Sequence, residues 1–116
     1  MDKEQLIKQY RKSIEELKEV RQKIFELGFE LKKTEQKINK IVNEEMKDIL
    51  SNKEFKNQQQ RELELKSRLG QNDDYLLLKV KKDDIQEQID KHKLEERYLH
   101  NLKTFYSDIC KIIDNN

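Results

Sequence analysis

Three side chains that could bind a metal ion recur at four-residue spacing in the last third of the chain: His92, Glu96 and His100. Residues four apart share one face of an α-helix, so these groups could face a common ion. Structural zinc sites usually close with four ligands, however, and no Cys/His pair lies nearby in the sequence. We therefore interpret the three residues as a charged helix face, and we predict neither a metal nor a cofactor.

Cys110 is the only cysteine, and it stands beside Ile109 and just before Ile112 and Ile113. A cysteine nucleophile needs a neighbouring base or cation that stabilises the thiolate, whereas apolar surroundings favour a small buried hydrophobe. The two glycines have no phosphate-binding spacing either. We therefore expect no enzymatic activity and no small-molecule substrate.

A single cysteine excludes an internal disulfide and favours a reducing compartment, so we expect a cytoplasmic protein. The N-terminal residues Met1-Asp2-Lys3-Glu4 lack the apolar segment of a secretion signal, and no apolar run approaches the roughly 18–20 residues that cross a bilayer. We expect no membrane partner.

Basic residues are slightly concentrated in the middle of the chain, although the net charge is only +1. Residues 31–70 carry ten basic and seven acidic side chains. Lysines and arginines that contact phosphates would give salt-dependent, sequence-independent binding of nucleic acid. The candidate contacts are Lys32, Lys33, Lys37, Lys40, Lys47, Lys53, Lys56, Arg61, Lys66 and Arg68. Interspersed acidic residues and the lack of an aromatic platform make this the second choice.

The composition is typical of long helices that pack through narrow apolar stripes. Only 34% of the residues are hydrophobic and 42% are charged, with two glycines and no proline. Apolar periodicity predicts helices at residues 2–49, 52–69 and 73–113 in a single domain, 1–116. We predict an all-α fold, an elongated antiparallel coiled-coil helical hairpin with a short connecting helix. A three-helix bundle is the alternative.

The first predicted helix has a regular apolar row at seven-residue spacing: Tyr10, Leu17, Ile24, Leu31 and Ile38. Its companion row would be Ile14, Arg21, Gly28, Glu35, Val42 and Ile49, which is imperfect in the middle. Glycine inside a helix costs about 1 kcal/mol relative to alanine, so either the helix bends at Gly28 or a neighbouring helix approaches it closely. The alternation from Phe25 to Leu31 could also indicate a strand, but its helical flanks favour a helix.

The stretch from Leu50 to Phe55 marks the boundary between the first two predicted helices. Ser51 and Glu54 have the spacing of a capping box, in which each side chain accepts from the other residue's backbone N–H. Leu50 and Phe55 flank this pair as a hydrophobic staple would. Further on, Gly70 is expected to close the second helix in the left-handed conformation, and Asn72 is among the residues that could cap the third.

The end of the third predicted helix carries an apolar stripe wider than a two-stranded coil requires. Its proposed interface residues are Leu94, Tyr98, Leu99, Leu102, Phe105, Tyr106, Ile109, Ile112 and Ile113. Part of this stripe should pack on the first helix, and the surplus should serve self-association, as a homo-oligomer, or a protein partner. We therefore expect a non-enzymatic coiled-coil interaction or assembly protein. The alternative is a nucleic-acid-associated or nuclease-modulating accessory protein that acts through the basic region 32–68.

A pattern in the second half of the chain runs Lys56-Asn57, Arg61, Leu65, Arg68-Leu69, Asp73-Asp74-Tyr75 and Leu78, followed by Tyr98-Leu99 and Phe105. It resembles the pattern of small helical coiled-coil accessory proteins encoded by phages and prophages of Gram-positive bacteria. The resemblance covers residues 55–106. It implies an accessory role near phage recombination or host takeover, with a host or phage protein as partner, and it carries over no catalytic residue.

Overall fold

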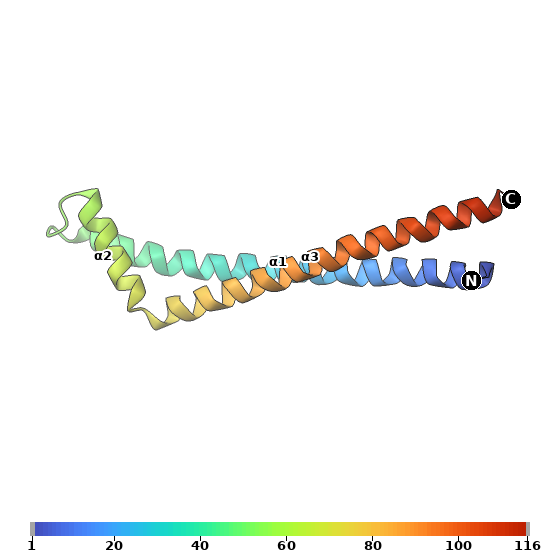
Figure 1. Ribbon diagram of the computed structural model, residues 1–116. Coiled ribbons are helices and arrows are strands. Elements are labelled where there is room, and N and C mark those ends of the chain that lie inside the picture. The colour runs from blue at the N-terminus through green and yellow to red at the C-terminus, as the bar shows by residue number, and fades with distance from the viewer. Residues whose placement is uncertain (1, 116) are drawn as a thin grey trace. The chain divides into compact units, whose positions relative to one another are not determined.

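Residues 2–115 form three helices, which are drawn in Figure 1. A computed structural model describes residues 2–115, so the two ends of the predicted domain 1–116 lie outside the described residues. The helices are α1 (Lys3–Ser51), α2 (Gln58–Gly70) and α3 (Asp73–Asp114), and the described part contains no strand. The prediction of an all-α helical hairpin with a short connecting helix is confirmed, and the strand interpretation of Phe25–Leu31 is wrong.

The chain divides into two compact units, each of which takes in parts of both long helices. Unit 1 combines the chain up to Gly28 with the chain from Glu87 onward, so it pairs the first half of α1 with the last part of α3. Unit 2 is Phe29–Gln86, which contains the second half of α1, all of α2 and the start of α3. The single domain remains a prediction.

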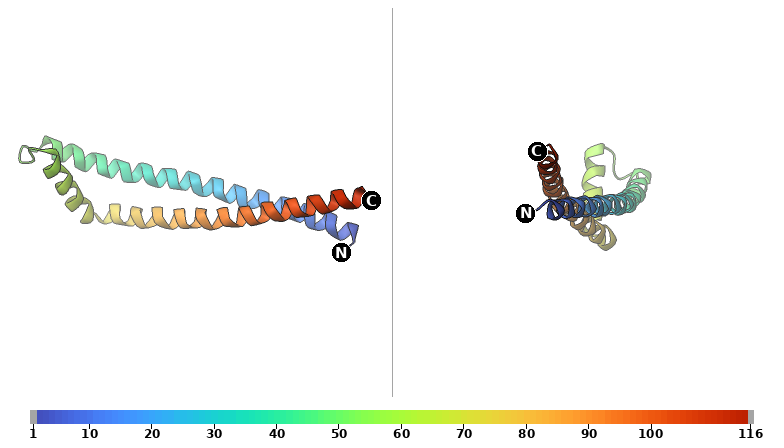
Figure 2. Two further views of the ribbon diagram at one scale, coloured as in Figure 1. Left: turned by 45° about the horizontal axis from the view of Figure 1, so that its top comes forward. Right: turned by 90° about the vertical axis from the view of Figure 1, so that its right-hand side faces the viewer.

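In each unit, α1 and α3 run antiparallel in one common register. In unit 1, Lys3 Nζ lies 2.9 Å from Asp114 Oδ1, and Arg21 Nε lies 3.3 Å from Glu96 Oε2. In unit 2, Lys82 Nζ lies 3.9 Å from Glu35 Oε1. The two residue numbers of each pair add up to 117, as expected for two helices that pair without a register shift. The first part of α1 and the last part of α3 lie side by side in both Figure 1 and Figure 2.

Two rows of side chains on α1 are buried or half-buried along the helix. Within each row the residues are seven apart, and the two rows together follow an alternating spacing of three and four residues. One is the predicted row of Tyr10, Leu17, Ile24, Leu31 and Ile38. The other is Leu6, Ser13, Val20, Leu27, Thr34 and Ile41, which replaces the predicted companion row. Arg21 and Gly28 of the predicted companion row are exposed. We refer to the two observed rows together as the seam of α1.

Two polar residues of the seam explain why the second row escaped the sequence pattern. Ser13 and Thr34 are each only 2% exposed. The Ser13 hydroxyl donates to the Tyr10 carbonyl at 2.6 Å, and the Thr34 hydroxyl donates to the Glu30 carbonyl at 2.9 Å. Because each hydroxyl is satisfied within its own helix, its burial leaves no unpaired polar group. A search for apolar residues alone passes over both positions.

Gly28 lies outside the seam. α1 continues through it without interruption, and a Cβ added at this position would meet no atom within 4 Å. The prediction that a neighbouring helix approaches Gly28 closely is therefore wrong. The apparent gap in the apolar pattern was an effect of the misassigned companion row.

The core of unit 1 forms where α3 inserts Leu99 against α1. Leu99 is 4% exposed and clusters with Leu17 and Val20, which are 2% and 4% exposed, and Ile24 packs against this cluster. Residues 17, 20 and 24 are spaced three and four apart on α1, so a leucine from the facing helix fits among them in knobs-into-holes fashion. This contact fixes the facing sides of the two helices in unit 1.

The start of α2 differs from the prediction by six residues, since α2 begins at Gln58 and not at residue 52. Ser51 is the last residue of α1, and its hydroxyl donates back to the Asp48 carbonyl at 2.7 Å. The Glu54 N–H donates to the Asn52 side chain at 3.0 Å. The predicted capping box is therefore wrong, because both of its members have other partners.

Asn57 caps α2 instead. Its side-chain oxygen accepts from the Gln60 N–H at 2.9 Å, and the Gln60 side chain accepts from the Lys56 N–H at 2.9 Å. Asn57 and Gln60 have the same three-residue spacing as a capping box, so the sequence held two competing signals. The folded chain uses the signal formed by Asn57 and Gln60.

The passage from α2 to α3 is also capped by asparagine. The Asn72 side chain accepts from the Tyr75 N–H at 2.9 Å, as one of the predicted caps would. The expectation of a left-handed conformation at Gly70 is wrong, because neither Gly28 nor Gly70 has a positive φ. The C-cap of α2 is Gln71, with φ −106° and ψ 0°. A three-helix bundle is not formed, since α2 has 13 residues and buries none of them.

Replacing Asn57 with alanine should lower the free energy of unfolding of unit 2 by about 1 kcal/mol, because one helix N–H loses its acceptor. Ser51→Ala removes only a hydroxyl that bonds within its own helix, so its effect should stay within about 0.5 kcal/mol. Urea titrations followed by circular dichroism measure both. Equal losses for the two variants would contradict Asn57 as the cap.

Candidate interaction surfaces

The structure divides the predicted interface residues of α3 between the seam with α1 and the solvent. Leu99 is buried, and Leu102, Tyr106 and Ile109 are half-buried. Ile113 keeps 36% of its surface exposed and lines a small cavity of about 20 Å³ in unit 1. The other four residues are exposed: Leu94, Tyr98, Phe105 and Ile112.

These four exposed residues, which we call the apolar row, lie on one side of α3. Tyr98, Phe105 and Ile112 are seven residues apart, and Leu94 is four residues before Tyr98. Seven residues are close to two helical turns, so the row follows α3 for about 27 Å. The exposed fractions of its members are 64% for Leu94, 64% for Tyr98, 56% for Phe105 and 61% for Ile112.

The apolar row is large for a surface feature. Side chains of these sizes, exposed to this extent, present roughly 500 Å² in total. The largest apolar patch of a typical soluble monomer is about 300–600 Å² and is often functional, so the row falls within this range. Phe105 is held in place by an edge-on contact with Tyr106, whose ring centroid is 5.6 Å away at an interplanar angle of 62°. Since Tyr106 is itself half-buried, the exposed phenyl ring is anchored to the hairpin.

The histidine face has its own local partners. His92 Nδ1 lies 3.3 Å from Glu95 Oε2, while Glu96 binds Arg21 of α1 and His100 is exposed. Within residues 2–115, no group of three His, Cys, Asp or Glu side chains is placed to hold a metal ion. Cys110 is half-buried and lines the small cavity beside Leu6 and Ile7 of α1.

Arg68 is the most constrained of the predicted nucleic-acid contacts. Its Nη1 lies 2.6 Å from Asp48 Oδ2 and 3.3 Å from Glu45 Oε2, and its Nε lies 2.9 Å from Glu64 Oε1. The hydrogen bonds to Asp48 and Glu64 raise the pKa of Arg68, so the guanidinium stays charged. Arg68 therefore joins α2 to the end of α1, and its Nε and Nη1 donors are occupied within unit 2.

The remaining nine predicted contacts lie in unit 2, and five of them are on α1. The Arg61 Nε donates to the Phe55 carbonyl at 3.2 Å, and the Lys33 ammonium sits 5.0 Å from the centroid of the Phe29 ring. Lys37 and Lys40 border an open hollow beside Leu77 of α3. The other five are exposed: Lys32, Lys47, Lys53, Lys56 and Lys66. The structure thus brings only part of this set together, on α1.

Comparisons with known proteins return nothing for this chain: no family model matches it, and neither a curated protein nor a solved structure is similar to it. Among the described residues, no helix combines the length and the apolar character that crossing a membrane requires. The functional conclusions therefore depend on the surfaces of the two units.

Replacing Arg68 with glutamine should lower the melting temperature of the protein, because Glu45, Asp48 and Glu64 lose their shared cation. Arg68→Lys should restore only part of the loss, since an ammonium lacks the planar fork that bonds several carboxylates at once. Lys66→Gln, two residues away on an exposed position, is the matched control and should melt like the wild type. Circular dichroism melts measure all three, and an unchanged R68Q melt would exclude the proposed joint between α1 and α2.

Proposed function

We propose that the protein is a non-enzymatic interaction and assembly protein that binds an amphipathic helix, from a partner protein or from a second copy, along the apolar row of α3. The observation that carries the proposal is the position of the row. Leu99 already fills the contact with α1, whereas Leu94, Tyr98, Phe105 and Ile112 are more than half exposed. The hairpin does not use their apolar surface.

The spacing of the row matches the chemistry of a helical partner. Tyr98, Phe105 and Ile112 recur every seven residues, which is the repeat by which one helix presents side chains to another. A groove-binding or coiled partner helix would cover such a row with residues at three- and four-residue spacing. An aromatic pair at its centre, Phe105 with Tyr106, resembles the anchors that dominate binding energy in interfaces.

The biological role and the cellular location of the protein are proposed from separate observations. The resemblance of residues 55–106 to phage and prophage accessory proteins is the support for a role beside a host or phage protein. The single cysteine, Cys110, is the support for a cytoplasmic location, because the thiols of cytosolic proteins are generally kept reduced.

Phe105→Glu should weaken association at least about tenfold, since it places a charge in the centre of the apolar row. Leu94→Glu should weaken it as well. Leu63→Glu is the matched control, because Leu63 is also 64% exposed but lies on α2 in unit 2. Sedimentation velocity measures self-association. Because a small interface associates weakly, the concentration series extends to about 100 µM.

A second experiment tests for a partner protein other than a second copy of this chain. Quantitative affinity purification with the wild type, F105E and L63E should show a protein that is retained by the wild type and L63E and lost with F105E. The proposal fails if the wild type sediments as a monomer at every concentration and no protein distinguishes F105E from L63E.

A further inference from the structure

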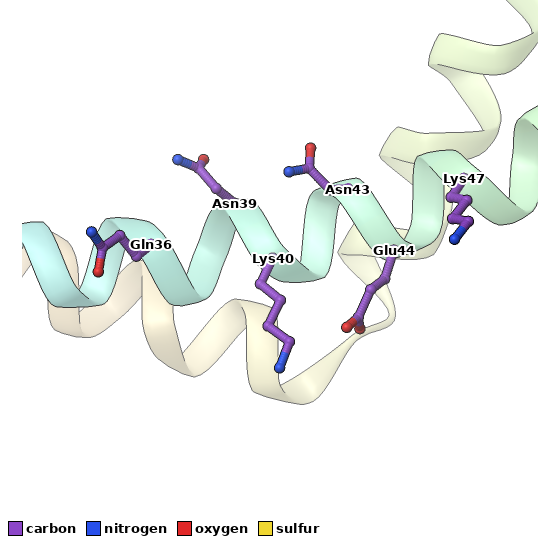
Figure 3. A pocket seen from close by; sticks show the side chains of 6 residues that line it. All are labelled: Gln36, Asn39, Lys40, Asn43, Glu44 and Lys47. Carbon is purple, nitrogen blue, oxygen red and sulfur yellow. The ribbon is translucent and has the colours of Figure 1, made fainter.

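The second half of α1 has an outward face of lysines and amides that the proposed function does not use. We define the lysine–amide face as Lys33, Gln36, Asn39, Lys40, Asn43 and Lys47, all of which are exposed in unit 2. Five of them, with Glu44, line an open hollow of about 420 Å³. Figure 3 shows Asn39 and Asn43 beside each other on one edge of this face, with Lys40 and Glu44 on the other edge.

Three carboxylates of α1 in this unit are already paired with cations of the other helices. The carboxylates that face the other helices are occupied: Glu35 binds Lys82, while Glu45 and Asp48 bind Arg68. Lys40 lies on the same side of α1 as Glu44, and both line a hollow that also contains Asp74 of α3. Within residues 2–115, neither Lys40 nor Lys47 has a carboxylate within ion-pair distance, and Lys33 contacts only the face of the Phe29 ring among charged or aromatic partners.

The first half of α1 is different, although it is the same helix. Its outward residues include Glu15, Glu19 and Glu26 among the lysines, and Lys12 Nζ lies 3.8 Å from Glu16 Oε1. Between Lys33 and Lys47 the lysines are instead separated by amides, and Glu44 at the edge is the one carboxylate of the hollow. The lysine–amide face is therefore a local feature and not a general property of the helix surface.

From this geometry we infer that the lysine–amide face of α1 binds the phosphate backbone of a nucleic acid, with its amides directed at sugar and base edges. Lysines contact phosphates, whereas asparagine and glutamine side chains both donate and accept hydrogen bonds at base edges. The three lysines are seven residues apart, about 10.5 Å along the helix, which is close to the rise of about three base pairs of duplex DNA.

Two other polyanions fit the face less well. An amphipathic helix that lies on anionic lipid buries a continuous apolar side in the membrane. Here the seam of α1 is buried within the hairpin, and Phe29, which contacts Lys33 and is 58% exposed, is a single apolar residue beside this face. An acidic peptide would pair with the lysines and bond the amides through its backbone, but it lacks the phosphate spacing of about 3.4 Å per base pair that the lysines match. The inference concerns unit 2 and is independent of the apolar row in unit 1, so either proposal can fail alone.

Fluorescence anisotropy with a labelled 20-base-pair duplex tests the inference on the full chain. Three phosphate contacts predict a slope of about −2.7 for log affinity against log salt, so affinity should fall about 40-fold between about 50 and 200 mM salt. The triple variant K33Q/K40Q/K47Q should bind at least about tenfold more weakly at the lower salt and lose most of this slope.

The matched control is K8Q/K12Q/K18Q, which removes three exposed lysines from the first half of α1 with the same change in net charge. It should bind within about twofold of the wild type. If the first triple variant loses helix by circular dichroism, K40Q alone is used, and its salt slope should be smaller by about 0.9.

Three results would overturn the inference: no change in anisotropy at the lower salt, equal losses in the two triple variants, or binding as tight to phosphatidylserine vesicles or to polyglutamate as to the duplex. A single-stranded probe of the same length separates duplex from single-strand preference. Binding of either probe that requires Lys33, Lys40 and Lys47 supports the inference.

Discussion

The hairpin depends on the contact between the seam of α1 and the facing side of α3. The seam repeats at alternating steps of three and four residues from Leu6 to Ile41, so it stays on one side of a long helix. Leu99 enters it between Leu17 and Val20, which sets the contact in unit 1. With this side of α3 committed, the remaining apolar residues of the helix are left on the outside. The apolar row is thus a direct consequence of where the seam lies.

Polar groups set the register that the apolar contacts alone would leave open. The pairs Arg21 with Glu96 and Lys82 with Glu35 join opposite charges across α1 and α3 at matching positions in the two units. Exposed pairs of this kind contribute little stability each, generally below about 1 kcal/mol, but a register shifted by one heptad would leave all four of these charges without their partners. Arg68 acts similarly on α2, a helix with no buried residue of its own, by bonding carboxylates of α1 and of α2.

Composition and periodicity predicted the helical class, the number of helices, the ends of the long helices to within two residues and one full row of the seam. They did not predict the second row, because Ser13 and Thr34 are buried with their hydroxyls bonded inside α1 and therefore look polar in the sequence. They also chose the wrong cap for α2. Ser51 and Asn57 both precede a glutamate or glutamine by three residues, and only the folded chain shows that Ser51 is still part of α1.

The division of the C-terminal stripe was not predicted, although the sequence held a signal for it: Leu99 lies fourteen residues, or two heptads, after the buried Ile85, whereas Leu94 falls outside that row. We propose that residues on the side of Leu99 stabilise the hairpin and that residues on the side of Leu94 bind a partner. The most direct measurement compares the free energy of unfolding of Leu99→Ala and Leu94→Ala by urea titration. Leu99→Ala should cost about 2–5 kcal/mol and Leu94→Ala less than about 0.5 kcal/mol. Similar losses in the two variants would contradict the assignment of the seam and of the apolar row.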